Sequence, residues 1–114
     1  MNEHKYLVYY YIGVITDIKN EPFNIGNLII NGDLIEIIDT ITNKRTIINN
    51  IISITKERHF FTIMVRIETM NDIIHIIHTS KIFNASNKSN RQIGNNKWTK
   101  QIYRRIMRIK NCSS

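Results

Sequence analysis

The chain has 114 residues, a formal net charge of +7 and a single cysteine, and 42% of its residues are hydrophobic. One cysteine excludes an intrachain disulfide, and the apolar run over residues 7–15 is too short to span a bilayer as a helix. We expect one domain over residues 1–114 with a single core, and an intracellular, cytoplasmic protein because no signal peptide is evident.

The apolar residues are mostly of one kind. The sequence contains 26 Ile but only three Leu, three Val and one Ala. β-Branched side chains pack well on pleated strands, and alanine, the best helix former, is almost missing. The composition therefore predicts a mainly β protein.

Charge is distributed unevenly along the chain. Residues 1–87 carry eight Lys and Arg and all nine acids, whereas residues 88–114 carry eight Lys and Arg and no acid. A field concentrated at one end of a chain indicates an acidic partner there. The acids of the body are expected on solvated faces of strands, with Glu36 and Asp39 on opposite faces.

The first expected strand covers residues 5–18, with alternating apolar side chains and an interruption at Gly13 that marks a bulge or a bend. Its three consecutive tyrosines, Tyr9, Tyr10 and Tyr11, cannot all point inward, so at least one is expected to be exposed. A loop is expected over residues 19–26, which include a proline.

The sharpest local signal lies in residues 27–39, where Asn31-Gly32 separates two apolar runs. An Asn-Gly pair suits a two-residue hairpin turn in which both residues take a positive φ. Polar residues 42–45 predict a second turn, and further strands are expected over residues 46–56, 60–69 and 73–79. A last short strand over residues 81–86 and a polar loop over residues 86–96 complete the body.

The final segment changes its period. Over residues 97–110, apolar side chains lie on one side of a helical projection and cations on the other, which predicts an amphipathic helix with Asn95 or Asn96 as its N-cap. The side expected to close the core comprises Trp98, Ile102, Ile106 and Ile109. The side expected to bind a partner comprises Lys97, Lys100, Arg104, Arg105 and Arg108. The alternatives are an exposed, stacking Trp98 and a merely solvated basic face.

Several strands followed by one C-terminal amphipathic helix, with a tryptophan near its start, resemble the pleckstrin-homology-like family and its GRAM variants. Residues 26–38 (GNLIINGDLIEII) resemble the family's second hairpin, and residues 46–54 (TIINNIISI) resemble the strand and turn that follow. Residues 83–86 (FNAS) and 98–102 (WTKQI) resemble its last strand and its helix. The resemblance implies a β+α fold, an antiparallel barrel or sandwich of six to seven strands capped by the helix.

The resemblance does not extend to a lipid site. Family members that bind phosphoinositides carry several Lys and Arg around the first loop between strands. The corresponding residues here offer Lys19 alone, between Asp17 and Glu21. One lysine beside two acids is a poor phosphate clamp, so we expect no specific phosphoinositide.

No residue pattern indicates catalysis or a cofactor. The four glycines are scattered, so no phosphate-binding loop is present. His75 and His78 lie three residues apart on an expected strand and would point to opposite faces, and Cys112 has no base near it in sequence. We therefore expect no enzyme, no metal site and no cofactor.

Three classes of partner agree with these features. The first is a non-catalytic adaptor or assembly subunit that binds a protein partner and contacts an acidic surface through the helix. The second is RNA or DNA binding through the helix and the loop before it, with few aromatic side chains for base stacking. The third is a peripheral contact with an anionic membrane.

Overall fold

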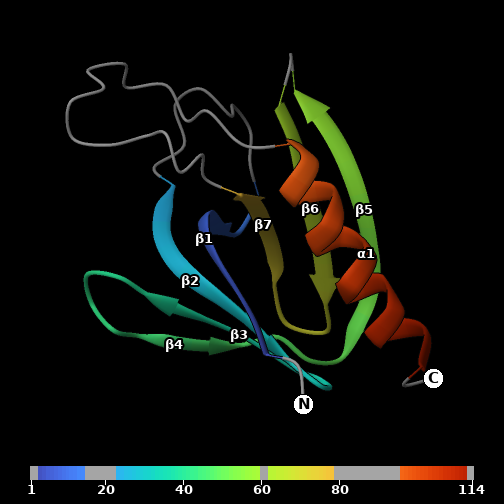
Figure 1. Ribbon diagram of the computed structural model, residues 1–114, viewed down its shortest axis with the longest axis horizontal. Helices are drawn as coiled ribbons and strands as arrows, with labels where there is room; N and C mark the ends of the chain where they lie inside the picture. The colour runs from blue at the N-terminus through green and yellow to red at the C-terminus, as the bar shows by residue number, and fades with distance from the viewer. Residues whose placement is uncertain (1–2, 15–22, 60–61, 79–95, 113–114) are drawn as a thin grey trace.

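A computed structural model describes residues 3–14, 23–59, 62–78 and 96–112 (Figure 1). The strands within these ranges are β1 (Glu3–Ile12), β2 (Asn24–Asn31), β3 (Leu34–Asp39), β4 (Arg45–Ile47), β5 (Ile51–His59), β6 (Thr62–Thr69) and β7 (Ile73–His78). One helix, α1 (Asn96–Cys112), follows them. The expected mainly β architecture capped by a C-terminal helix is therefore confirmed.

The seven strands form one antiparallel sheet in the order β4-β3-β2-β1-β7-β6-β5. The sheet curls into a half-barrel with β4 and β5 at its edges, and α1 packs along β5, β6 and β7 (Figure 1). The first strand lies in the middle, paired with β2 on one side and β7 on the other. It therefore joins two parts of the sheet, the β1–β4 part and the β5–β7 part.

The first strand is shorter than expected. It ends at Ile12, because Gly13 takes a φ of 133° and turns its N–H toward the carbonyl oxygen of Ile73, 2.8 Å away. The second strand begins at Asn24, inside the segment expected to be a loop. Residues 15–18 of the expected strand and residues 19–22 of the expected loop lie outside the described residues.

Two of the three consecutive tyrosines are buried, on opposite faces of the sheet. Tyr10 belongs to the main core on the inner face, whereas Tyr9 packs with Met64 and Ile77 on the outer face. Tyr11 is half-buried. The expectation that at least one of them is exposed is wrong, because β1 is a central strand whose outer face carries its own small apolar cluster.

A two-residue turn joins β2 to β3, one position later than expected. Asn31 pairs with Leu34, so the turn residues are Gly32 and Asp33. Gly32 has a φ of 61°, and neither Asn31 nor Asp33 has a positive φ. This is the pattern of a type II′ turn, in which only the first turn residue needs the positive φ that glycine adopts at little cost.

Two asparagines with positive φ delimit β4. Asn43, with a φ of 61°, lies in the expected polar turn before it, and Asn50, with a φ of 54°, separates it from β5. Asparagine tolerates this left-handed region better than most residues. The segment expected as one strand over residues 46–56 is therefore divided between the two edges of the sheet, while the expected strand and loop over residues 81–95 lie outside the described residues.

The main core lies between the inner face of the sheet and one side of α1. Ile102 and Ile106 are fully buried there, and Ile109 is half-buried at the margin. Trp98, expected to close the core, is 36% exposed, whereas Thr99 is fully buried. Thr99 takes the inner position because it lies three residues before Ile102 and seven before Ile106, on the same side of the helix. The expected place of Trp98 was therefore wrong by one residue.

Two acids of the β1–β4 part are buried, contrary to the expectation that they are solvated. Asp39 accepts hydrogen bonds from the Tyr10 hydroxyl at 2.7 Å and from the N–H groups of Ile41 and Thr42 at 2.8 and 2.9 Å. The Thr42 N–H, followed by the Tyr10 hydroxyl and the Ile41 N–H, lowers the pKa of Asp39 to about 2. Burial, followed by the bond to Asp39, raises the pKa of Tyr10 to about 12.

Glu36 lies on the opposite face of β3 from Asp39, as expected, and forms an ion pair with Arg45 of β4. The hydrogen bond and the charge of Glu36 raise the pKa of the Arg45 guanidinium. Both buried carboxylates therefore have partners within the sheet or its turns, and both serve the structure.

A glycine makes room for the Tyr10–Asp39 contact. Gly26 lies in β2, and its register partners are Val8 of β1 and Asp39 of β3. A Cβ atom at Gly26 would lie 2.9 Å from Cε1 of Tyr10 and 2.8 Å from Cγ2 of Ile37, closer than side-chain atoms normally approach. The absence of a side chain therefore lets the Tyr10 ring cross β2 and reach Asp39.

Candidate cationic binding surface

The helix α1 carries six cations and no acid. Lys97, Arg104 and Arg108 are exposed, and Lys100 is half-buried. These four residues are spaced three or four positions apart, so they share one side of the helix, away from the buried Ile102. They lie on the solvent side of α1, which is where the sequence analysis placed them.

Arg105, expected beside them, faces β1 instead. Its Nε donates to the Tyr6 hydroxyl at 2.8 Å, and its Nη1 lies 2.9 Å from Nε2 of His4, which accepts because arginine has no acceptor. The Tyr6 hydroxyl donates in turn to Oε1 of Gln101 at 2.8 Å. Arg105 lies at the flank of the helix nearest β1, and it fastens α1 to the first strand.

Strand β5 adds two cations that the sequence analysis did not select. Lys56 and Arg58 are exposed and alternate with Ile54, which is buried in the main core. Residues two apart in a strand share a face, so both cations lie on the side of β5 that faces α1. The alternation is visible in the sequence, but the helix α1, which the two cations face, follows much later in the chain.

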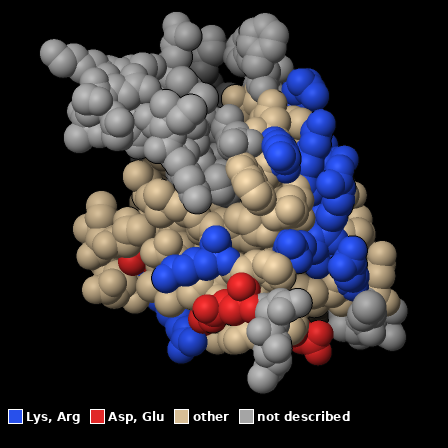
Figure 2. All heavy atoms as spheres, viewed as in Figure 1, with Lys and Arg blue, Asp and Glu red and all other residues tan. Residues whose placement is uncertain are grey.

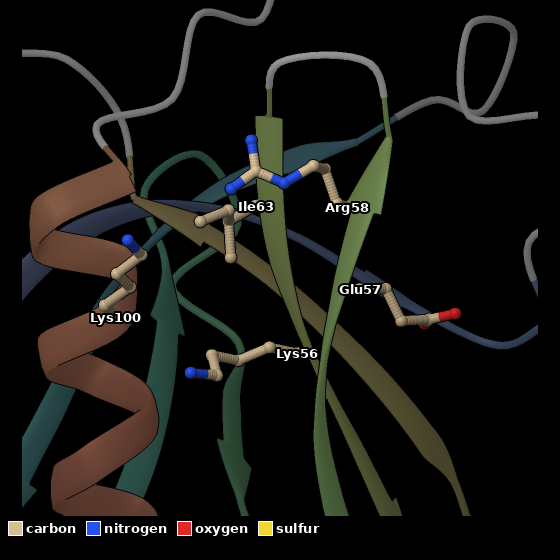
Figure 3. Close-up of a pocket in the computed structure, with 5 residues that line it drawn as sticks. All are labelled: Lys56, Glu57, Arg58, Ile63 and Lys100. Carbon is tan, nitrogen blue, oxygen red and sulfur yellow. The ribbon is translucent and has the colours of Figure 1, made fainter.

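The cations of β5 and Lys100 of α1 converge on one cleft. It has a volume of about 300 Å³ and is lined by Lys56, Glu57, Arg58, Ile63 and Lys100. The guanidinium of Arg58 and the amino group of Lys100 point toward the space around Ile63, the amino group of Lys56 points toward α1 below Ile63 in this view, and the carboxylate of Glu57 points away from α1 (Figure 3). Three cations that line one small cleft suit a compact anion such as a phosphate group.

Two contacts hold the margins of this cleft in place. The side-chain oxygen of Asn96, the first residue of α1, accepts a hydrogen bond at 2.9 Å from the N–H of Ile63 in β6. The Nζ of Lys56 lies 4.8 Å from the centre of the Tyr103 ring, a cation–π contact between β5 and α1. The cleft is therefore formed by a helix and two strands that are fixed to one another.

The first turn of α1 adds an aromatic ring beside these cations. The Nζ of Lys97 lies 5.7 Å from the centre of the Trp98 ring, and Lys100 follows within the same turn. Trp98 lies outside the main core and is 36% exposed, so part of its indole is accessible next to positive charge. We refer to Lys56, Arg58, Lys97, Lys100, Arg104 and Arg108 as the cationic surface.

No described acid neutralises the cationic surface. None of its six residues forms an ion pair with another described residue, whereas Arg45 pairs with Glu36 and Arg66 with Glu68, at 3.6 Å, elsewhere in the sheet. Lys and Arg side chains gather in a band on the side of the molecule that carries α1, and the acids visible in that view lie at the left side and in the lower part of the molecule (Figure 2). Such a field attracts anions and accelerates their association.

The chemistry of this surface is that of anion binding, since lysine and arginine supply hydrogen-bond donors and positive charge. In residues 3–14, 23–59, 62–78 and 96–112, no three His, Cys, Asp or Glu residues come together as a metal site would require. His75 is buried in β7, and the side chains of His78 and Cys112 lie outside the described residues. Within the described part of the chain, no helix is both long and apolar enough to cross a membrane.

The resemblance to the pleckstrin-homology-like family stays a prediction from the sequence. The chain matches no family model, and neither a curated protein nor a solved structure is significantly similar to it.

Proposed function

We propose that this chain is a non-catalytic binding module, an adaptor or an assembly subunit, that holds an acidic partner on its cationic surface. One observation carries the proposal: Lys56, Arg58 and Lys100 come from two elements and converge on one cleft. Like charges at close range repel one another, so a cluster of this kind is favourable chiefly when an anion occupies it.

The rest of the molecule supports this assignment. In the β1–β4 part Glu36 is paired with Arg45, and α1 carries no acid that could neutralise its own cations. The architecture agrees with the one implied by the pleckstrin-homology-like resemblance, but the proposed site lies between α1 and β5 rather than at the first loop. We place the module inside the cell, as the sequence predicts.

Retention on immobilised heparin, a polyanion without bases, tests the proposal. We expect K100Q/R104Q and K56Q/R58Q each to elute at clearly lower salt than the parent protein. The matched control is K5Q/K44Q, which removes the same net charge from two exposed lysines outside the cationic surface. It should elute close to the parent protein, because only charges near the bound anion act strongly through the ionic screening of the buffer.

The two pairs of variants make the outcome decisive. Equal shifts for K100Q/R104Q and K5Q/K44Q would show that retention follows net charge alone, and the proposal would fail. Thermal denaturation of each variant accompanies the measurement, so that a lost fold is not mistaken for a lost site. The replacements should leave the free energy of unfolding within about 1 kcal/mol of the parent value, with the larger loss for K56Q/R58Q, which removes the cation–π contact of Lys56 with Tyr103.

A further inference from the structure

We infer that the acidic partner is a single-stranded nucleic acid, whose phosphates lie on the cationic surface and one of whose bases stacks on Trp98. The inference rests on the proposed function and deepens it by naming the chemical class of the partner. It depends on two features that occur together: a row of cations ending at a cleft, and an exposed indole within the same helical turn.

The row of cations suits a flexible chain of phosphates. Lys97, Arg104 and Arg108 follow the exposed side of α1, and with a rise of about 1.5 Å per residue they extend over about 17 Å. At the N-terminal end of α1, where this row meets the cleft, Lys100 and the cations of β5 surround it. A single strand can follow the row and place one phosphate in the cleft, because its backbone carries a charge at every nucleotide.

Trp98 supplies what phosphate binding alone would not need. The residue is 36% exposed, and the Nζ of Lys97 lies 5.7 Å from the centre of its ring. Base stacking on an aromatic side chain tolerates any sequence, since every base has a π face, and cations beside the ring hold the neighbouring phosphates. A partner with both rings and phosphates therefore matches the first turn of α1 better than an acidic peptide does.

Two other anionic partners match less well. A duplex keeps its bases paired and stacked, so an exposed indole gains no base from it. An anionic membrane binds amphipathic helices through an apolar face that inserts among the lipids, but here that face of α1, with Ile102 and Ile106, is buried in the core. The membrane and the duplex become arms of the test.

The protein contains a single tryptophan, so the fluorescence excited at wavelengths that its five tyrosines do not absorb reports on Trp98 alone. We would titrate the parent protein with 12-nucleotide mixed-sequence single-stranded DNA, the same sequence as RNA, the DNA duplex, heparin, and vesicles containing phosphatidylserine. We expect strong quenching by a single strand, with the DNA and RNA arms identifying the preferred sugar. Heparin should bind with little quenching, because it has no base to stack.

Anisotropy of a labelled single strand gives the affinity of variants. Trp98→Ala should weaken binding about fivefold to a hundredfold, the range observed when one stacking aromatic is removed. Trp98→Phe, the matched control, should keep most of the affinity, and both variants should bind heparin as the parent does. Contacts with four to six phosphates predict that log K falls with log salt at a slope of about −3 to −4.

The possible outcomes separate the inference from the function on which it rests. If heparin binds but single strands leave the fluorescence and the Trp98→Ala affinity unchanged, the inference is wrong and the proposed function stands. Equal or tighter binding of the duplex, or displacement of the strand by vesicles with a blue shift of the emission, would also overturn it. If heparin binding does not depend on the cationic surface, the proposed function itself fails.

Discussion

The two parts of the curled sheet use charged side chains in different ways. In the β1–β4 part, Glu36 and Asp39 are buried, and each has partners in the neighbouring strand or turn. In the β5–β7 part with its helix, an open cleft is surrounded by Lys56, Arg58 and Lys100. None of these three cations forms an ion pair with a described acid. The buried carboxylates of the first part have fixed partners, whereas the cations around the cleft of the second part face solvent.

The contrast shows how structural and functional charges can be distinguished. A buried carboxylate is tolerated only when donors replace its water, so its partners must be fixed, and the pair then fixes the fold. Exposed cations of like sign keep their hydration and contribute repulsion instead of structure. Substitutions in the first part should therefore change stability, and those on the cationic surface should change binding.

The largest expected effect concerns the buried side of α1. Ile106→Ala removes a fully buried side chain from the core. We expect it to lower the free energy of unfolding by about 2–5 kcal/mol, measured by chemical denaturation. Trp98→Ala deletes a larger side chain but an exposed one, and it should cost less than half as much. A larger cost for Trp98→Ala would contradict the observed orientation of α1, in which Thr99 and not Trp98 faces the core.

The next effect probes the β1–β4 part through its closest packing. Gly26→Ala places a Cβ atom 2.8 Å from Cγ2 of Ile37 and 2.9 Å from the Tyr10 ring, with the Ile38 carbonyl oxygen 3.1 Å away. Overpacking of this kind costs about 1–3 kcal/mol, and it should also displace Tyr10 from Asp39. Denaturation curves would measure the loss, and heparin binding should not change. A fully stable variant would mean that the ring has room elsewhere.

The Tyr10–Asp39 contact also makes the first part sensitive to pH. The pKa of Asp39 falls from 3.8 to about 2 on folding, so its stabilising effect is present above pH 3.8 and is lost as pH falls toward 2. The pKa of Tyr10 rises from 10.0 to about 12, so its effect is present below pH 10 and is lost as pH rises toward 12.

Asp39→Asn and Tyr10→Phe separate the loss of stability at acidic pH from the loss at alkaline pH. The free energy of unfolding of Asp39→Asn should fall less steeply than that of the parent between pH 4 and 2, because no carboxylate remains to be protonated. Tyr10→Phe should weaken the dependence between pH 10 and 12, to which Tyr9 also contributes because burial raises its pKa. Denaturation across the pH range measures both. Parent-like slopes in both variants would show that other groups govern the limits of stability.

The smallest expected effect compares two adjacent arginines. Arg105→Gln breaks the contacts with Tyr6 and His4 and should cost about 1 kcal/mol of stability, with heparin affinity nearly unchanged. Arg104→Gln should change stability by less than about 0.5 kcal/mol and weaken heparin binding. Both variants lose one charge. If Arg105→Gln weakened heparin binding and Arg104→Gln did not, the assignment of Arg104 to the cationic surface and of Arg105 to the contacts with β1 would be wrong.

Local pattern was sufficient for much of this architecture. Alternating isoleucines predict strands because each alternation marks one buried face, and the change of period marks the helix within two residues at each end. Asn31-Gly32 also located a hairpin. It did not fix the register, because Gly32 alone meets the requirement of a type II′ turn and the pairing of Asn31 with Leu34 decides the rest.

What the sequence did not reveal depends on pairs that are distant in the chain. Trp98 lies four residues before Ile102 and Thr99 lies three before it, so the helical period admits either residue, and the packing of α1 on the sheet selects Thr99. The cleft requires α1 beside β5, and the burial of Asp39 requires Tyr10, 29 positions away. Composition and periodicity contain no information on such neighbours.

The contacts of Arg105 with β1 also bear on the order in which the chain folds. The bonds that join Tyr6 to Gln101, Arg105 to Tyr6 and Arg105 to His4 span 95, 99 and 101 positions. During synthesis β2 can pair with β1 at once, but β7 and α1 emerge much later, so one edge of β1 must wait for them. A central strand that is paired late by β7 and then bonded to the last helix implies slow closure, and we expect refolding on the order of milliseconds to seconds.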